Sequence, residues 1–347
     1  MRRFSACVWV AVLVGGCQGE IAGTDEADDS GALLRLEGEA LELAFAGRRV
    51  SPVYEPAEPF MRLALLWDAS SDGAIEARTS ADGETWSEWT APGVHFVEEV
   101  AHVGTIDLEV PGVAYQLRVP AGVELPTHVA VDPVVRLPDE DTGEVAIEEG
   151  YDDTDGMLDA AAPAEGEVGA ASEAISAAGL TIHQRREWGA RAPRCVTRQS
   201  PWRATIHHTV TPTRDSLSVP ARLRQIQSFH MFGRGWCDIA YNYLISRDGR
   251  VWVGRGARRM GGHVFNENSG NVGISFIGTY SSTRLSLAQR RNAARLLRRL
   301  HNRFPAIQLN RRDIKGHRQY GAQGGGTECP GNAAYPQLDG IVRLARQ

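Results

Sequence analysis

The pattern of apolar and polar positions changes its period near Leu180. Before that point, short apolar runs are separated by turns that contain Gly or Pro. Short runs broken at such intervals are typical of an all-β sandwich. We therefore predict a β-sandwich-like domain over residues 30–138, with strands over residues 63–67, 74–78, 115–119 and 128–131.

After Leu180 the pattern alternates between strands and helices. Strands are predicted over 203–208, 239–246, 250–253 and 272–277, the middle two joined as a hairpin across Arg247-Asp248-Gly249. Helices are predicted over 219–232, from an N-cap at Ser286 to 303, and over 338–344. Residues 179–347 are thus expected to form an α/β domain with a mixed β-sheet flanked by helices.

One hairpin in the N-terminal half carries two tryptophans. An Asp82-Gly83 turn precedes Trp86 and Trp89, and the segment is similar to the Asp-box hairpin of sialidase-type β proteins, one residue shorter. The pair could form an aromatic platform for carbohydrate. Residues three apart on a strand face opposite sides, so the favoured interpretation places at least one ring in the core.

Charge is distributed unevenly between the two halves. There are 35 acidic and 9 basic residues before Leu180, and 8 acidic and 28 basic residues from Leu180 onward. Residues 139–173 contain 13 acidic residues and no basic one, so we expect an acidic disordered linker over 139–178.

The basic C-terminal half suits an anionic partner or a solvated Arg-rich surface. No recognition helix or RNA-stacking motif accompanies the charge, so nucleic acid is not expected. An anionic cell-wall polymer would fit the positive charge as well as a nucleic acid would. The protein is expected to be a monomer.

The first 17 residues have the composition of a targeting segment. Met1-Arg2-Arg3 is basic, and residues 4–14 are apolar but too few to span a bilayer permanently. The stretch from Leu13 to Cys17 resembles a bacterial lipoprotein cleavage site, in which Cys17 would carry the lipid that anchors the protein to the membrane. Ordinary secretory cleavage without a lipid is the alternative, and both predict export to the cell envelope.

Three residues suggest metal chemistry. The strand 203–208 ends in His207 and His208, and His317 and Cys329 follow far downstream. Two imidazoles and one thiolate leave a tetrahedral Zn²⁺ one open position, which distinguishes a catalytic zinc from a structural one. Neighbouring residues of a strand face opposite sides, so His208 is expected to be packed or to support a ligand rather than bind the ion itself.

Several motifs in this half occur together and in order. The sequence resembles the peptidoglycan recognition proteins and related zinc amidases over residues 180–347. The motifs that carry the resemblance are Ile206-His207-His208-Thr209, 235–245, 248–256, Gly262-His263, 271–278, Gly316-His317-Arg318 and 327–331.

The resemblance implies that His207, His317 and Cys329 bind Zn²⁺ and that Tyr241 and Thr327 line the reaction centre. A phenol at Tyr241 could stabilise the oxyanion formed in amide hydrolysis, and Thr327 could orient the water. Glu328, beside a ligand in a tight turn, is expected to point away.

The implied activity is that of an N-acetylmuramoyl-L-alanine amidase, which hydrolyses peptidoglycan between the lactyl group of muramic acid and the first alanine of the stem peptide. A non-catalytic peptidoglycan receptor of the same fold is the first alternative. Receptors of the family typically have another residue in place of the cysteine ligand, whereas this sequence has Cys329 at that position. An adhesion or scaffold protein that acts through its N-terminal domain is the second alternative.

The remaining cysteines and the substrate residues complete the predictions. With Cys7 removed with the signal, Cys17 lipidated and Cys329 on the metal, Cys195 and Cys237 are predicted to form a disulfide. Substrate-binding roles are predicted for His208, His263, Arg258 and Arg259, and bracing of the zinc site is the equal alternative for His263. Many relatives have a tryptophan where Ala257 stands, and the paired guanidiniums of Arg258 and Arg259 could instead clamp a free carboxylate such as that of diaminopimelate.

Overall fold

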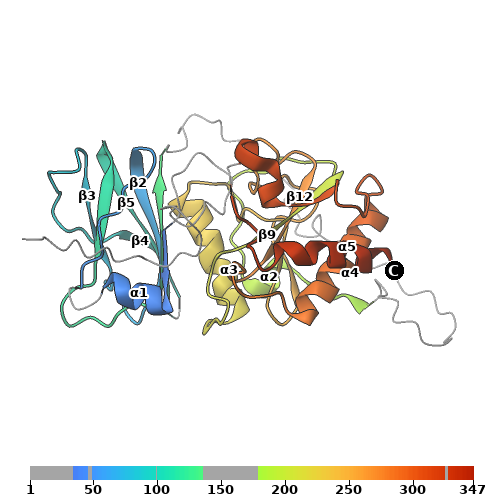
Figure 1. Ribbon diagram of the computed structural model, residues 1–347, viewed down its shortest axis with the longest axis horizontal. Helices are drawn as coiled ribbons and strands as arrows, with labels where there is room; N and C mark the ends of the chain where they lie inside the picture. Colours follow the sequence, from blue (N-terminus) through green and yellow to red (C-terminus); the bar gives the residue numbers. More distant parts are fainter. Residues whose placement is uncertain (1–33, 46–48, 99, 136–178, 325–326) are drawn as a thin grey trace, which may run out of the picture.

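The computed structural model describes residues 34–45, 49–98, 100–135, 179–324 and 327–347. The predicted signal segment 1–17, with Cys17, and the predicted linker 139–178 lie outside the described residues. A β-rich N-terminal part and a larger α/β part lie side by side, with helix α3 (Val219–Ser228) between their sheets (Figure 1).

The N-terminal part contains two antiparallel sheets. The N-terminal sheet has five strands in the order β1-β7-β2-β5-β4, and the second sheet pairs β3 with β6. Its elements are β1 (Leu34–Glu37), α1 (Gly38–Ala44), β2 (Phe60–Asp68), β3 (Glu76–Ser80), β4 (Gly93–Glu98), β5 (Ala101–Gly112), β6 (Ala114–Arg118) and β7 (His128–Val134).

Strand β2 is buried on both of its faces. Leu63, Leu65 and Trp67 pack into the core between the two sheets and α1. Ala64 and Leu66 point the other way and join a second cluster that includes residues of the α/β part. Alternate residues of a strand face opposite sides, so this sheet has two buried faces where β2 lies.

The tryptophan pair is not part of either core. Trp86 and Trp89 are both half-buried, and the Arg78 guanidinium lies 4.8 Å from one ring centroid and 4.7 Å from the other. Arg118 also lies over Trp89, at 4.7 Å. The interpretation that one ring is core was wrong because residues 81–89 do not form a strand, so the alternation of a strand does not apply.

The C-terminal part is built on a mixed sheet of six strands in the order β13-β9-β12-β10-β11-β8. Only the β10–β11 hairpin is antiparallel; the other neighbours are parallel. Strand β12, which corresponds to the strand predicted over 272–277, lies inside the sheet. The strands are β8 (Ile182–His183), β9 (Arg203–His208), β10 (Tyr243–Ile245), β11 (Val251–Val253), β12 (Asn271–Phe276) and β13 (Ile314–Gly316).

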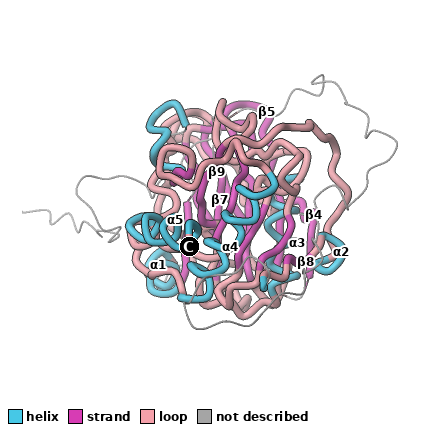
Figure 2. Tube along the Cα trace, turned by 90° about the vertical axis from the view of Figure 1, so that its right-hand side faces the viewer, coloured by secondary structure: helices cyan, strands magenta, loops and turns pink. Residues whose placement is uncertain are grey.

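Helices cover both faces of this sheet (Figure 2). Helices α4 and α5 pack on Ile206 and Ile274, and α2 and α3 pack on Leu244 and Trp252. The predicted α/β architecture of this half, a mixed sheet flanked by helices, is confirmed. None of the helices in the described ranges combines the length and the apolar character needed to cross a membrane. The helices are α2 (Arg185–Trp188), α3, the π-helix η3 (Phe229–Gly233), α4 (Leu287–Arg303), η4 (His317–Gly324), η5 (Tyr335–Gln337) and α5 (Leu338–Arg346).

Hydroxyl caps fix the starts of the two long helices. The Ser218 side chain accepts a hydrogen bond from the Ala221 amide at α3, and Pro220 lies in the first turn. Ser286 caps α4 and forms a reciprocal capping box with Gln289. The N-cap predicted at Ser286 is therefore present, and such caps stabilise a helix by about 1 kcal/mol.

Candidate metal centre

Strand pairing brings the two candidate histidine ligands together. Strand β13 runs parallel to β9 with Gly316 opposite Ile206, so His317 follows beside His207. Their ring centroids are 4.7 Å apart. Cys329 arrives from the loop after η4, and one ligand atom from each of His207, His317 and Cys329 lies within 4.8 Å of the others. All three residues are buried.

The spacing of these atoms fits a shared zinc ion. His207 Nδ1 lies 3.6 Å from Cys329 Sγ. A tetrahedral zinc about 2.3 Å from sulfur and about 2.0 Å from nitrogen would hold two such ligand atoms about 3.5 Å apart. The donor set and the observed separation therefore both suit Zn²⁺.

His263 fixes which nitrogen of His207 faces the cysteine. His207 Nε2 lies 3.0 Å from His263 Nδ1, and His263 Nε2 lies 3.2 Å from the Asn271 carbonyl oxygen. A carbonyl only accepts, so His263 Nε2 donates, and a neutral His263 must then accept at Nδ1. His207 Nε2 therefore donates, which leaves its Nδ1 lone pair directed at Cys329.

The protein keeps these imidazoles neutral. Burial lowers the pKa of His263 to about 3, an effect that the hydrogen bond to the Asn271 carbonyl opposes and the charge of His317 reinforces. Burial also holds the pKa of His207 well below its ordinary value, and the neighbouring histidines lower it further. Neutral imidazoles are the form that binds a metal ion.

Two glycines make room for the His263 ring. A Cβ atom on Gly273 would lie 2.4 Å from His263 Cδ2, and one on Gly261 would lie 2.3 Å from the same atom. Any larger residue at either position would push the ring off His207. The backbone around His263 is thus built for an imidazole in this one place.

The loop that carries Cys329 is held on both sides. Thr327 Oγ1 accepts a hydrogen bond from the Cys329 amide at 3.0 Å, and the Arg318 amide donates to the Cys329 carbonyl at 2.9 Å. Gly331 has a φ of 95°, and a Cβ there would lie 2.4 Å from the Tyr280 backbone. Glu328 is exposed, in agreement with the expectation that it points away.

Tyr241 packs against the metal-ligand group. Its ring is fully buried, with its centroid 5.3 Å from that of His207 and 5.9 Å from that of His230. The Arg255 amide donates to the Tyr241 carbonyl at 2.9 Å. His230 is buried, and its Nδ1 accepts a hydrogen bond from the Ala240 amide at 3.1 Å.

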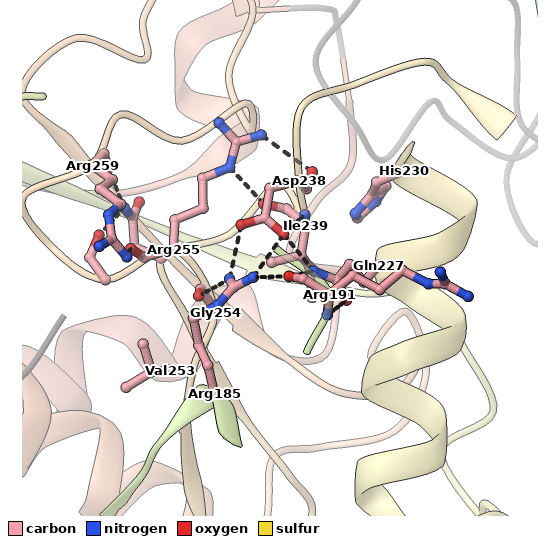
Figure 3. A network of polar contacts seen from close by, with 12 residues as sticks. Arg185, Arg191, Gln227, His230, Asp238, Ile239, Val253, Gly254, Arg255 and Arg259 are labelled. Carbon is pink, nitrogen blue, oxygen red and sulfur yellow. Dashed lines mark hydrogen bonds and ion pairs between the residues drawn. The ribbon is translucent and has the colours of Figure 1, made fainter. Parts of the chain in front are cut away.

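A buried ion pair supports the segment that leads into Tyr241 (Figure 3). Arg185 and Asp238 are 2% and 3% exposed and lie 2.8 Å apart. Gln227 donates to the same carboxylate at 2.6 Å. Arg255 donates to the backbone carbonyls of Asp238, Ile239 and Met260. These contacts fix the backbone on both sides of the tyrosine.

The structure corrects part of the predicted substrate set. His208 is 1% exposed, lies on the opposite face of β9 from His207, and accepts a hydrogen bond from the Tyr280 amide at 3.0 Å. His263 uses both ring nitrogens on protein groups, so it supports His207 rather than contacting substrate.

The proposed arginine clamp is not formed. The Arg258 guanidinium lies 5.4 Å from the Phe304 ring, against the α4 side of the sheet. Arg259 is buried, and its Nη1 lies 3.5 Å from the Arg255 carbonyl. Arg258 lies in a turn and Arg259 in an isolated β-bridge with Arg198, and their guanidiniums lie against different protein groups, so they do not converge on one carboxylate.

The predicted disulfide is present in the structure. Cys195 and Cys237 form a disulfide, which ties the segment before β9 to the segment after η3. Cys329 is not in a disulfide. Its sulfur therefore remains available to a metal ion.

The polar residues around His263 were missed by sequence reasoning. Thr205 Oγ1 lies 2.9 Å from both Asn271 Oδ1 and the Tyr320 hydroxyl. The sequence of β12 did indicate these polar residues, because Asn271, Gly273 and Ser275 alternate with apolar residues there. That alternation marks one face of β12 as the wall of the site.

The sequence is similar to one protein family and to several known proteins of that family. The profile of the Amidase_2 family, described as N-acetylmuramoyl-L-alanine amidase, matches residues 197–332. Peptidoglycan-recognition protein SC2 of Drosophila simulans is 37% identical over 163 residues, which covers 46% of this chain and 85% of that protein. N-acetylmuramoyl-L-alanine amidase of Sus scrofa is 32% identical over 172 residues, 45% of this chain and 26% of that protein.

Among solved structures, the crystal structure of Drosophila peptidoglycan recognition protein SD is similar to this chain. It has 29% sequence identity, covers 46% of this chain and 94% of that one, and gives a TM-score of 0.41. The family assignment follows from the sequence relatives. Through its C-terminal half, the chain belongs to the family of peptidoglycan recognition proteins and type 2 N-acetylmuramoyl-L-alanine amidases.

Proposed function

We propose that the protein is a zinc-dependent amidase that hydrolyses the bond between N-acetylmuramic acid and the first L-alanine of the peptidoglycan stem. The convergence of His207, His317 and Cys329 in one buried group supports this best. Two histidines and a cysteine leave a zinc ion an open position, which a purely structural site would fill with a fourth protein ligand.

The site also favours an enzyme over a non-catalytic receptor. Cys329, the ligand that receptors of this family typically replace, is present and lies 3.6 Å from His207 Nδ1. Tyr241 packs on the same imidazole. A receptor needs neither an intact ligand set nor a buried phenol beside it.

Each residue has a distinct part in the proposed reaction. Bound zinc would supply an activated water and polarise the scissile carbonyl. Tyr241 would donate a phenolic hydrogen bond to the oxygen on which negative charge develops, an interaction whose loss costs about 3 kcal/mol or more in comparable sites. His263 keeps the Nδ1 of His207 unprotonated, and Thr327 holds the backbone of Cys329 in place.

Digestion of purified sacculi tests the proposal. The full-length protein should release free stem peptides, detected by mass spectrometry, and lose this activity on chelation and regain it with added zinc. Cys329→Ala should abolish release, while Glu328→Gln, a change at the exposed neighbouring residue, should not. Binding to sacculi without release would identify a receptor, and neither binding nor release would favour an adhesion or scaffold role.

Export and lipid attachment belong to the same proposal. Cys17 lies outside the described residues, so lipidation rests on the sequence pattern. Mass spectrometry of the mature amino terminus should find a diacylglyceryl-modified Cys17. An unmodified amino terminus released into the medium would instead support ordinary secretion.

A further inference from the structure

The N-terminal sheet covers the outer side of α3. Residues from β2, β4, β5 and β7 form one apolar cluster with residues of the amidase half. Seven side chains of α3 are buried, on both its sheet-facing and its outward side. The cluster comprises Ala64, Leu66, Phe96, Ala101, Val103, Ala130 and Val134 on one side and Val210, Leu217, Ala221 and Phe229 on the other.

Ion pairs cross the same interface. Arg222 and Asp68 have side chains 1% and 2% exposed and pair at 2.6 Å. Burial would raise the pKa of Asp68, but the charge and hydrogen bonds of Arg222, together with His128 and Gln225, outweigh it and the pKa is lowered. Arg234 and Asp132, 2% and 0% exposed, pair at 2.8 Å. Because an isolated buried charge is costly, an interface with such pairs is expected to be permanent.

The π-helix η3 connects this interface to the metal centre. Phe232 stacks on His95, with ring centroids 5.6 Å apart. Arg62 Nη1 lies 3.4 Å from the Phe232 and Gly233 carbonyls. These three contacts lie on the side of η3 that faces the N-terminal sheet.

The opposite side of the same turn reaches the site. His230 stacks on Trp236 at 5.1 Å, meets Tyr241 edge-on at 5.9 Å, and accepts the Ala240 amide. Arg234 lies 4.8 Å from the Trp236 ring centroid and binds Asp132 of the N-terminal sheet. One turn of helix thus separates the N-terminal sheet from Tyr241.

We propose that the N-terminal β domain is a permanent positioning element of the amidase, with Asp132 and Arg234 holding η3 so that His230 places the Tyr241 phenol. The proposal rests on the proposed function for its kinetic consequence. It gives the N-terminal domain a role in the reaction without any ligand of its own. The π-helix η3 connects the two parts, because one of its sides contacts the N-terminal sheet and the other contacts Tyr241.

Asp132→Asn in the full-length protein tests the positioning role. We expect kcat for stem-peptide release to fall at least about tenfold, because small misplacements of catalytic groups carry such losses. KM and zinc content should stay unchanged. Arg234→Gln should behave alike, and the double variant should cost little more than either single change.

Glu98→Gln is the matched control. It breaks the pair between Glu98 and Arg224, which also crosses the interface but is 29% and 24% exposed and lies on α3 rather than η3. Its kcat should remain within twofold of wild type. If Asp132→Asn lowers the melting temperature but leaves kcat at the wild-type value, the contact is merely structural and the proposal is wrong.

A second experiment does not depend on activity. A protease site inserted within residues 139–173 would allow the chain to be cut between its halves. The halves should co-elute after cleavage, and the NMR ring signal of Tyr241, assigned with Tyr241→Phe, should shift in Asp132→Asn but not in Glu98→Gln. Separation of the halves, or an unmoved signal, overturns the proposal even if the protein proves to be a receptor.

Discussion

His207 Nδ1 lies 3.6 Å from Cys329 Sγ, although 122 residues separate them in the chain. The parallel pairing of β13 with β9 brings His317 to the same point. The lone pair of His207 Nδ1 faces the sulfur because His263 engages the other ring nitrogen.

Replacing Cys329 with alanine should remove bound zinc. The thiolate supplies the one anionic ligand of the group, so two neutral imidazoles alone would bind the ion far more weakly. Elemental analysis of dialysed protein should give close to one zinc per wild-type chain and almost none for the variant. A fully loaded variant would show that the zinc is held elsewhere.

Removing the imidazole of His263 should weaken zinc binding without abolishing it. His263→Ala deletes the acceptor that fixes the His207 tautomer, and such outer contacts typically contribute about 10–100-fold to metal affinity. Competition with a chromogenic chelator measures the change. His183→Ala, at a ring stacked on Trp252 far along the sheet, provides the comparison and should match wild type.

Tyr241→Phe should separate catalysis from metal binding. The phenylalanine ring keeps the contacts with His207 and His230, so the fold and zinc content should not change. Loss of the hydroxyl should lower kcat by about 10²–10³, the usual cost of removing one oxyanion donor. Steady-state kinetics on a soluble muropeptide gives the value, and a kcat within twofold of wild type excludes the assigned role.

Breaking the Arg185–Asp238 pair should destabilise the protein strongly. Asp238→Asn leaves a guanidinium that is 2% exposed without its counter-ion, and such changes cost about 3–5 kcal/mol in the free energy of unfolding. Asp339→Asn is the control, since Asp339 is 79% exposed in its pair with Arg311 and should change stability by less than about 1 kcal/mol. Urea titration compares the two, and equal losses would contradict the assignment.

His128 should make stability depend on pH. Its pKa is lowered to about 3 by burial, which the charges of Arg222 and Arg35 reinforce and that of Asp68 opposes. The unfolded chain therefore takes up the proton first. This histidine's contribution is complete above about pH 6.5 and is lost progressively as the pH falls toward about 3.

The pH dependence can be measured against a variant. Between pH 6.5 and 4.5 the wild type should lose about 2–3 kcal/mol through His128. His128→Gln removes the titrating group and should flatten that part of the curve, even if its stability at neutral pH is lower. Parallel curves for the two proteins would mean that His128 is protonated in the folded state.

Much of the C-terminal half could be predicted from local pattern. Val219, Pro220 and the Ser286 cap marked the helix starts, and the Asp248-Gly249 turn marked the hairpin. The close approach of the metal ligands could not be predicted from local pattern alone, because only the register of β13 on β9 shows that His317 lies beside His207. Register is set by packing between distant segments, which a single sequence does not display.

The interface between the two halves was missed, although β2 carried a signal for it. A strand with one exposed face alternates apolar and polar residues, whereas 63–67 is apolar throughout. Such a run indicates burial on both faces. The partner of the second face could not be identified, because the charges that meet there, Asp68 with Arg222 and Asp132 with Arg234, are separated by about 100 residues or more.

The doubly covered helix α3 determines where the protein can be shortened. A fragment that begins at residue 179 would expose Val210, Leu217, Ala221 and Phe229 to water as one continuous apolar strip. It would also bring Arg222 and Arg234 to the surface without Asp68 and Asp132. The acidic segment that looks like a boundary in the sequence is therefore a poor place to truncate, and a soluble version of the C-terminal half needs its N-terminal companion or a repacked outer face of α3.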